Sequence, residues 1–430
     1  MRRAFRSSFF HCLDDPGPAA NPAAVEYVED GLLVVEDGTI AAFGPARELL
    51  PAMRVGTVVE DLSGKLVLPG LIDCHVHYAQ LDIIASYGER LLDWLNRYAY
   101  PAEARFADRA HGREVARAFL DELLRNGTTT ALVFATVFPE SVDAIFQAAE
   151  ARGMRLVAGK VLMDRECPEA LRDDADSAYA DSRELIERWH GKARLGYAIT
   201  PRFALTSSEA QLAAAGRLAA EFPDTWVHTH LAENAEEVAA IARQFPWSRS
   251  YLDVYDHFGL LRERSVFAHC LHLGAADRAL LAKKGGAGAF CPTSNLFLGS
   301  GLFDLEAMTD AGVPVGLATD VGAGTSLSLL KTMSEAYKVL HLQSQTLPAA
   351  RAIYLATLGA ARALGLDAVI GNFDVGKEAD FIVIDGAGAA LTARRTRSAK
   401  SIDEKLFSLI FLGDDRNIAA TYLQGKACRI

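Results

Sequence analysis

The chain has few cysteines, and none of them belongs to a recognisable disulfide, redox or zinc-binding motif. No Cys-x-x-Cys element occurs among the six. A disulfide-rich scaffold would need paired cysteines, and a cysteine zinc cluster would need closely spaced pairs of them. Both classes are therefore excluded, and the scattered pattern fits a reducing compartment. The cysteines are Cys12, Cys74, Cys167, Cys270, Cys291 and Cys428.

Excess positive charge and long apolar runs are also missing. The 430 residues include 44 Lys plus Arg against 55 Asp plus Glu, a net charge of −11, and no basic block that could follow a phosphate backbone. We therefore expect no nucleic-acid partner. No stretch approaches the roughly 18 to 20 uncharged apolar residues of a membrane span, and residues 1–17 lack the apolar core of a signal peptide. The sequence predicts a soluble, cytoplasmic protein that does not contact membranes.

Both ends of the chain are rich in short β-type segments. Residues alternate in character at Gly31–Glu36, and an apolar run at Phe381–Asp385 follows a turn-forming segment. Half of all residues are hydrophobic, which is enough for one large core and a smaller second one. We predict that residues 1–66 and 370–430 form an accessory β-sandwich domain beside a larger domain of residues 67–369.

The middle of the chain alternates short apolar runs with amphipathic stretches. Helical periodicity occurs at residues 113–126, 141–152, 207–222 and 327–340. Eight strands alternating with helices over roughly 300 residues are typical of an α/β fold of the (β/α)8 TIM-barrel type. An open doubly wound sheet is the alternative, but the glycine-rich nucleotide turn that usually follows its first strand is absent. The apolar runs are 66–73, 129–136, 155–163, 194–200, 226–231, 265–271, 288–292 and 314–320.

Histidines and carboxylates occur where several of these strands are predicted to end. Within LVLPGLIDCHVHYAQ (66–80), His75 and His77 are two residues apart, so a strand points both imidazoles to the same side. The carboxyl ends of barrel strands meet at one mouth, where the chemistry of such folds is located. The sequence therefore predicts a metal site with nitrogen and oxygen ligands at that mouth. The other strand ends carry His228, His230, Glu233, His269 and Asp320.

The histidines and Asp320 at these strand ends resemble the amidohydrolase superfamily, whose members hold one or two metals at a barrel mouth. Without an evident bridging lysine, the set is similar to the mononuclear zinc branch that deaminates purines and pyrimidines. Within that branch the chain resembles the guanine deaminases over almost its whole length, although Phe138 stands where that family carries a histidine. The segments that carry the resemblance are PGLIDCHVHYAQ (69–80), LLDWLNRYAYPAEARF (91–106), AGKVLMD (158–164), TPRF (200–203), HTHLAEN (228–234), FCPTSNLFLGSG (290–301) and ATDVGAGTS (318–326).

The resemblance implies one Zn²⁺ ion per chain. A hydrolytic zinc site takes nitrogen and oxygen ligands and keeps one position for a water, whose pKa falls to about 7. Fe²⁺ could occupy the same ligands, and the sequence does not decide between the two metals. His269 is expected beside the bound water as an orienting or proton-holding group. The expected ligands are His75, His77, His230 and Asp320.

The resemblance also implies guanine as the substrate and hydrolytic deamination as the reaction. This reaction needs one proton carried from the attacking water to a ring nitrogen and another delivered to the leaving amine. Glu233, three residues after His230, is the expected proton shuttle, and Asp320 is the expected second base. A glutamate that merely begins a helix is the alternative for Glu233.

Four further residues are expected to recognise the purine. Arg202 would donate to the O6 carbonyl, and Gln80 would offer one donor and one acceptor to the ring edge. Phe203 and Trp94 could stack on the purine faces. Alternatively, Arg202 lies on the surface and Trp94 packs in the core or at a dimer contact. The resemblance implies a homodimer.

Three rival functions remain open from the sequence. The nearest is another mononuclear amidohydrolase that acts on a related purine, pyrimidine or triazine, such as an 8-oxoguanine deaminase. A binuclear hydrolase of cyclic amides would need Lys160 as a carbamate bridge, whereas we predict Lys160 to be structural. A non-enzymatic homologue would be expected to have lost some ligands, and this chain keeps the full set. We predict that His228 is an interior histidine rather than a ligand.

Overall fold

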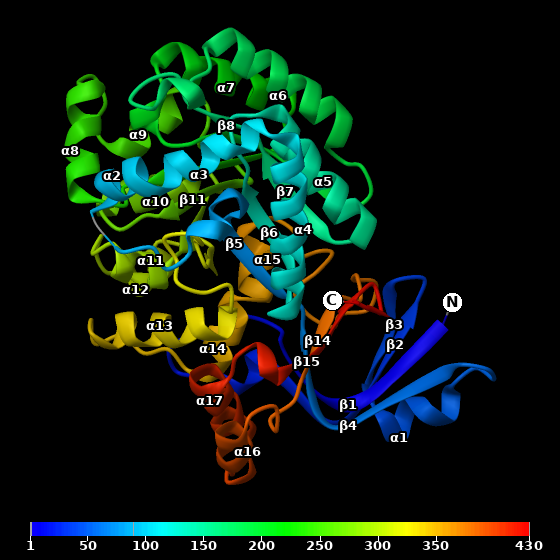
Figure 1. The fold of residues 1–430 in the computed structure, drawn as a ribbon. Helices are drawn as coiled ribbons and strands as arrows, with labels where there is room; N and C mark the ends of the chain where they lie inside the picture. Colours follow the sequence, from blue (N-terminus) through cyan, green and yellow to red (C-terminus); the bar gives the residue numbers. More distant parts are fainter. Residues whose placement is uncertain (1, 89, 430) are drawn as a thin grey trace. The chain divides into compact units, whose positions relative to one another are not determined.

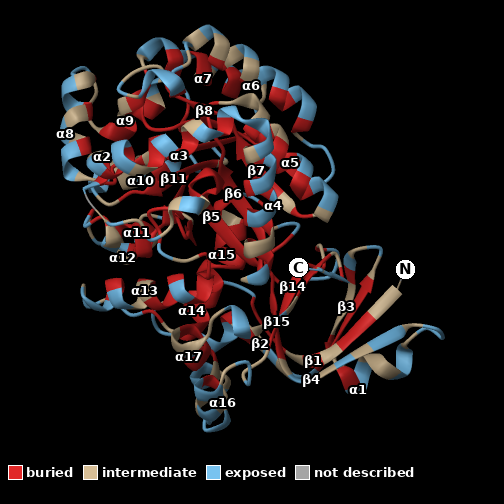
Figure 2. Ribbon diagram, in the orientation of Figure 1, coloured by how far each residue is buried: buried red, intermediate tan, exposed pale blue. Residues whose placement is uncertain are grey.

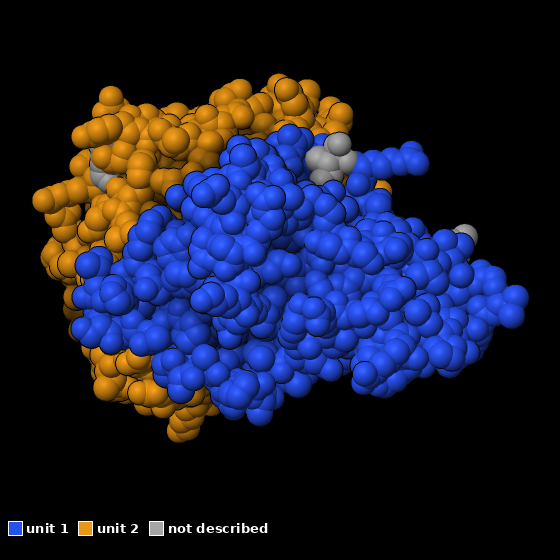
Figure 3. Space-filling model, turned by 90° about the horizontal axis from the view of Figure 1, so that it is seen from below, with its two compact units in different colours: residues 1–72, 121–130, 328–430 blue, residues 73–120, 131–327 orange. Residues whose placement is uncertain are grey.

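The structure is a computed structural model that describes residues 2–88 and 90–429, so the end residues of the predicted accessory domain lie outside the described residues. The chain divides into two compact units, which Figure 3 colours separately. Unit 1 comprises residues 1–72, 121–130 and 328–430, and unit 2 comprises residues 73–120 and 131–327. The domain boundaries expected from the sequence stay a prediction. Of the described helices, none is both long and apolar enough to cross a membrane.

A seven-stranded sheet in unit 1 joins the two ends of the chain. The first strand, β1, pairs antiparallel with β2 and parallel with β4, and β14 pairs antiparallel with β4 and β15. The rings of Phe381 and Tyr422 stack with centroids 4.4 Å apart, and Phe5 and Phe9 complete this core. The predicted association of the terminal β segments is confirmed. In sheet order the strands are β16 (Lys426–Ala427), β15 (Ile418–Leu423), β14 (Phe381–Ile384), β4 (Val58–Pro69), β1 (Arg2–Cys12), β2 (Val25–Glu36) and β3 (Thr39–Pro45).

Eight strands in sequential order form the second sheet, a nearly closed parallel barrel (Figure 1). Backbone hydrogen bonds from Asp320 N to His75 O (2.9 Å) and from His77 N to Val321 O (2.8 Å) join the segment after the last strand to the first. The predicted barrel is confirmed, and the short strands are buried on both faces, as parallel strands usually are (Figure 2). The strands are β5 (Leu71–His77), β6 (Thr128–Phe134), β7 (Arg155–Gly159), β9 (Leu195–Pro201), β10 (Trp226–Leu231), β11 (Ser265–His269), β12 (Ala287–Phe290) and β13 (Val315–Leu317), and the short β8 (Val161–Leu162) pairs with β9.

The apolar run 66–73 was predicted as one strand, and this prediction is wrong. Residues up to Pro69 belong to β4 of the terminal sheet, and the barrel strand β5 begins at Leu71. Pro69 has no N–H to continue a ladder. A Cβ at Gly70 would lie 2.1 Å from Thr129 Oγ1, so only glycine allows this close approach at the break.

Helices follow the strands as the periodicity predicts. Pro139 occupies the first turn of α5, and Gly153, in the left-handed region, ends it. Asp174 begins α6 with a capping box. The helices are α1 (Ala46–Leu49), α2 (Leu91–Trp94), α3 (Tyr100–Ala104), α4 (Arg109–Arg125), α5 (Pro139–Arg152), α6 (Ala175–Trp189), α7 (Glu209–Glu221), α8 (Ala235–Gln244), α9 (Tyr251–His257), α10 (Ala275–Lys283), α11 (Pro292–Phe297), α12 (Leu305–Asp310), α13 (Leu329–His341), α14 (Ala349–Leu355), α15 (Leu358–Ala363), α16 (Ala390–Arg397) and α17 (Ile402–Leu412).

Candidate metal centre and active site

Strand β5 supplies the first two imidazoles of the site. His75 and His77 lie on the same face of this strand, and both are buried. The Nε2 atom of His77 lies 3.2 Å from Nε2 of His75 and 3.2 Å from Nε2 of His230, which comes from β10. The alternation of a strand therefore places both histidines of the His-x-His pair at one point, as the sequence predicts.

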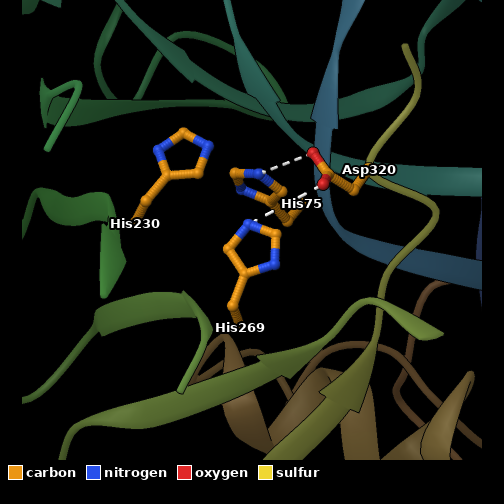
Figure 4. Close-up of side chains that lie close together, drawn as sticks. All are labelled: His75, His230, His269 and Asp320. Carbon is orange, nitrogen blue, oxygen red and sulfur yellow. Dashed lines mark ion pairs between the residues drawn. The ribbon is translucent and has the colours of Figure 1, made fainter. Parts of the chain in front are cut away.

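Two further strand ends complete a group of metal-ligand atoms in unit 2. One donor atom from each of His75, His230, His269 and Asp320 lies within 4.8 Å of the others (Figure 4). The Oδ1 atom of Asp320 is 3.1 Å from His75 Nε2 and 3.4 Å from His77 Nε2. Its Oδ2 atom is 3.7 Å from His269 Nε2. Four separate strand ends thus bring five possible ligands together.

The outer ring nitrogens determine how two of these imidazoles face the centre. His230 Nδ1 lies 2.7 Å from the carbonyl oxygen of Arg202, which can only accept a hydrogen bond. His269 Nδ1 lies 2.8 Å from the side-chain oxygen of Asn295, also an acceptor. Both Nδ1 atoms therefore carry the proton, and both Nε2 atoms present a lone pair to the centre.

His228 lies one layer deeper in the barrel. Its Nε2 atom is 2.7 Å from His75 Nδ1, so it orients a candidate ligand and is itself an interior residue, as predicted. Burial lowers the pKa of His75 and lowers that of His77 to about 4. Burial also holds the pKa of His228 and His230 well below the ordinary value. Burial therefore favours the neutral form of these imidazoles, which is the form that binds a metal.

Asp320 is the anionic member of the group. Burial alone would raise its pKa, but the facing imidazoles of His75 and His77 hold it well below the usual range. Among the described residues, His77 Nδ1 and His269 Nε2 are buried and have no hydrogen-bond partner. Converging lone pairs around a carboxylate are unfavourable unless a cation lies between them. The donor set therefore fits a divalent metal, and which of the five donors ligate it stays a prediction.

Glu233 follows β10 at the edge of this group. Its Oε2 atom is 3.4 Å from His269 Nε2, and its Oε1 atom accepts a 3.2 Å hydrogen bond from Ser300 Oγ. Burial, reinforced by the charge of Asp320, raises the pKa of Glu233 to about 8. Glu237 in the first turn of α8 accepts the backbone N–H of Glu233 at 3.0 Å and so holds its position. A buried acid that titrates near neutrality can both donate and accept a proton.

A pocket opens directly beside these groups. Every predicted site residue except His75, which is fully buried, lines it. Trp94, which is 2% exposed, has a buried Nε1 with no hydrogen-bond partner among the described residues. The apolar part of the wall contains a phenylalanine, a tryptophan and several leucines, which suits a flat aromatic ligand. The lining residues are His77, Gln80, Leu91, Trp94, Leu95, Arg202, Phe203, His230, Glu233, His269, Leu298, Asp320 and Ala323.

Comparison with known proteins places the chain in a family. The sequence profile described as the amidohydrolase family matches residues 66–428. The chain belongs to the amidohydrolase family. The guanine deaminase of Escherichia coli strain K12 is 49% identical over 427 residues, which cover 99% of this chain and 97% of that protein.

Solved structures of guanine deaminases also resemble this amidohydrolase. The structure of E. coli guanine deaminase superposes with a TM-score of 0.97 at 48% identity and covers 99% of both chains. A guanine deaminase from C. acetobutylicum, solved with guanine bound in its active site, has a TM-score of 0.91 at 27% identity and covers 100% of both chains.

Arg202 is buried in this amidohydrolase, which excludes the surface alternative. Its guanidinium lies over the ring of Tyr100, with Cζ 5.2 Å from the centroid. Its Nη1 atom donates to both carboxylate oxygens of Glu103, at 2.9 and 2.7 Å. Burial alone would lower the pKa of Arg202, but the Glu103 carboxylate more than offsets this effect and raises it. Sequence reasoning missed Glu103, although it lies within the segment 91–106 that carries the family resemblance.

Asp73 is a second residue whose role the sequence did not reveal. It shares the strand face of His75 and accepts hydrogen bonds from Thr319 N (3.0 Å) and Thr319 Oγ1 (2.5 Å). These bonds fix the residue that precedes Asp320. The only feature of the sequence that could have indicated this role is the position of Asp73 two residues before His75.

Lys160 and Phe138 both make contacts that stabilise the fold. The ammonium of Lys160 is buried and forms an ion pair with Asp173, which agrees with a structural lysine rather than a metal bridge. Phe138 is half-buried and packs against the apolar cluster that includes Trp94 and Phe203. Its apolar ring therefore adds to the packing behind the cavity wall.

Proposed function

We propose that this amidohydrolase converts guanine and water to xanthine and ammonia. The observation that carries the proposal is the 49% identity to a guanine deaminase along almost the whole of both chains. The cavity beside the metal-ligand group supports it independently, because its polar groups suit an oxo-purine. Arg202 can donate only, and guanine carries an accepting carbonyl at position 6 where adenine carries an amine.

We propose one zinc ion per chain, held by His75, His77, His230 and Asp320, with Fe²⁺ as the alternative. The neutral imidazoles and the carboxylate fit this metal class. When bound, zinc activates water as a nucleophile at neutral pH and stabilises developing negative charge. All other steps follow from groups of the chain.

Glu233 carries the protons. It accepts one proton as water adds to C2 of guanine and delivers it to the adjacent ring nitrogen. The second proton, taken from the hydroxyl that the added water has formed at C2, then reaches the amine, the C2–N bond breaks, and ammonia leaves with the carbonyl of xanthine in its place. Asp320 serves as the second base, and His269, 3.4 Å from the Glu233 carboxylate, orients the attacking water.

The cavity wall recognises the purine. Arg202 donates to O6, and Gln80 pairs with the ring edge. Phe203 and Trp94 cover the apolar ring faces. A buried group that loses its partner is strongly unfavourable, so these contacts discriminate against purines that lack the carbonyl.

A substrate panel tests this proposal. Purified protein is assayed for ammonia release from guanine, 8-oxoguanine, adenine and cytosine, and for ring opening of hydantoin, which releases no ammonia. Guanine should give the highest kcat/KM. Faster ammonia release from 8-oxoguanine than from guanine would show that 8-oxoguanine is the preferred substrate. Opening of the hydantoin ring would indicate a hydrolase of cyclic amides.

We also propose a homodimer and a cytoplasmic location. None of the six cysteines, all of which lie within the described residues, forms a disulfide, which supports a reducing compartment. The homodimer is suggested by the family resemblance, and sedimentation of the purified protein tests it.

A further inference from the structure

One buried carboxylate joins the two polar groups that line the cavity wall. Glu103, in α3, is 1% exposed and accepts both hydrogen bonds of Arg202 Nη1. It also accepts a 2.8 Å hydrogen bond from Gln80 Nε2. Glu103 does not itself line the cavity, so among the described residues it stands behind the two groups that do.

These contacts determine which atoms Gln80 offers to a ligand. A carboxylate can only accept, so the Gln80 atom that faces Glu103 is the amide nitrogen. On the other side, the backbone N–H of Gly322 lies 3.2 Å from Gln80 Oε1. Glu103 and Gly322 therefore hold the amide in one orientation, which leaves one N–H and one oxygen lone pair of Gln80 for a ligand.

Glu103 also determines how Arg202 presents its donors. A guanidinium carries five N–H groups, and the two on Nη1 are directed at Glu103. The described hydrogen bonds leave the Nε and Nη2 donors of Arg202 for the cavity. Without the carboxylate, a buried cation would stand beside the metal group with no partner, and its most stable position would change.

We propose that Glu103 is a positioning residue that sets specificity for the 6-oxo group by holding Arg202 and Gln80 in their donor and acceptor orientations. The inference rests on the proposed function, because the 6-oxo group belongs to the proposed substrate. A purely structural ion pair is the competing explanation. The two differ in one respect, since a structural pair would not distinguish ligands with and without the 6-oxo group.

Glu103→Gln is the informative substitution. A glutamine has one accepting oxygen where the carboxylate has two, so an NH₂ group must face either Arg202 or Gln80 as donor against donor. Hypoxanthine and unsubstituted purine are suitable probes, because they differ in the 6-oxo group and neither has a 2-amine to be removed. Equilibrium binding of each probe to the metal-loaded enzyme is measured by calorimetry.

The variant should bind hypoxanthine about 10- to 100-fold more weakly than the wild type, the range for one lost hydrogen bond to a charged group. Its affinity for purine should change by less than about threefold. The kcat/KM for guanine should fall with the hypoxanthine affinity. Asp173→Asn is the matched control, because it disrupts the buried ion pair with Lys160 outside the cavity and should leave the ratio of the two affinities unchanged.

Equal weakening of both probes, or unchanged hypoxanthine affinity, would overturn the inference. If Glu103→Gln does not fold, Arg202→Met is compared with the Arg202→Met, Glu103→Gln double variant, which contains no unpaired charge. Equal hypoxanthine affinity of these two proteins supports the inference, and a further tenfold loss overturns it. A wild-type enzyme that releases no ammonia from guanine contradicts the proposed function instead, whereas one that does so but binds both probes equally contradicts only the inference.

Discussion

Replacement of Glu233 by glutamine separates its proton transfer from its place in the fold. The two side chains have nearly the same shape. The pKa of Glu233 is raised to about 8, so at pH 7 the metal-free side chain is mostly uncharged and the substitution removes little charge. The amide oxygen can still accept from Ser300 Oγ, and the amide NH₂ can donate to the unpaired Nε2 of His269. We therefore expect the free energy of unfolding to change by less than about 1 kcal/mol below pH 4.5, where the carboxyl of Glu233 is protonated in both the folded and the unfolded chain.

The effect on catalysis should be much larger. An amide cannot carry a proton from water to a ring nitrogen, and a positioned general acid–base group contributes about 10²- to 10⁴-fold. This corresponds to about 3 to 5 kcal/mol in the activation barrier. Steady-state ammonia release gives kcat, metal analysis gives occupancy, and thermal unfolding gives stability. Glu236→Gln, a neighbouring exposed position on α8, is the control and should keep full activity.

A Glu233→Gln variant with bound metal and a kcat within about fivefold of the wild type would refute this assignment. Loss of metal together with activity would show instead that the carboxylate contributes to the metal site.

Three further outcomes are expected. Chelation should abolish activity and lower Tm, and stoichiometric Zn²⁺ should restore both. The reason is that the converging histidines bind their cation only in the folded state. A His230→Ala variant should respond to neither treatment. In the metal-free protein, the Glu233 carboxyl titrates near pH 8 folded and near 4.5 unfolded, so its stabilising contribution is complete below pH 4.5 and is lost as the pH rises to 8. Denaturant titrations should therefore show Glu233→Gln gaining on the order of 4 kcal/mol relative to the wild type across that interval; parallel pH curves would contradict the shift. Phe381→Ala should lower the free energy of unfolding by about 3 to 5 kcal/mol, because its ring stacks on Tyr422 in the unit 1 core; a loss below 1 kcal/mol in urea would show that this core relaxes around the cavity.

The barrel and its metal-ligand group could be predicted because both follow from short-range periodicity. Strand alternation places His75 and His77 on one face, and parallel strands bring their carboxyl ends to one mouth. His230, His269 and Asp320 could then be placed without knowing how any loop folds. The break between two strands at Gly70 could not be predicted, because the need for glycine there depends on the Thr129 side chain that approaches it.

Glu103 could not be identified for a related reason. It lies on a short helix between the first two barrel strands, 23 residues from Gln80 and 99 from Arg202, and no periodic pattern brings these three together. Only the folded path of the segment around α3 places its carboxylate behind the cavity wall. The roles of Arg202 and Gln80 were available from resemblance, whereas the group that orients them was visible only as a contact.

The most direct test of the central claim is the reaction of guanine in water enriched in ¹⁸O, followed by mass spectrometry of the product. Hydrolytic attack at C2 predicts one molecule of ammonia per turnover and xanthine that carries a single ¹⁸O at C2, with the original oxygen retained at C6. Xanthine without label at C2, or no conversion of guanine by the metal-loaded enzyme, would contradict the account.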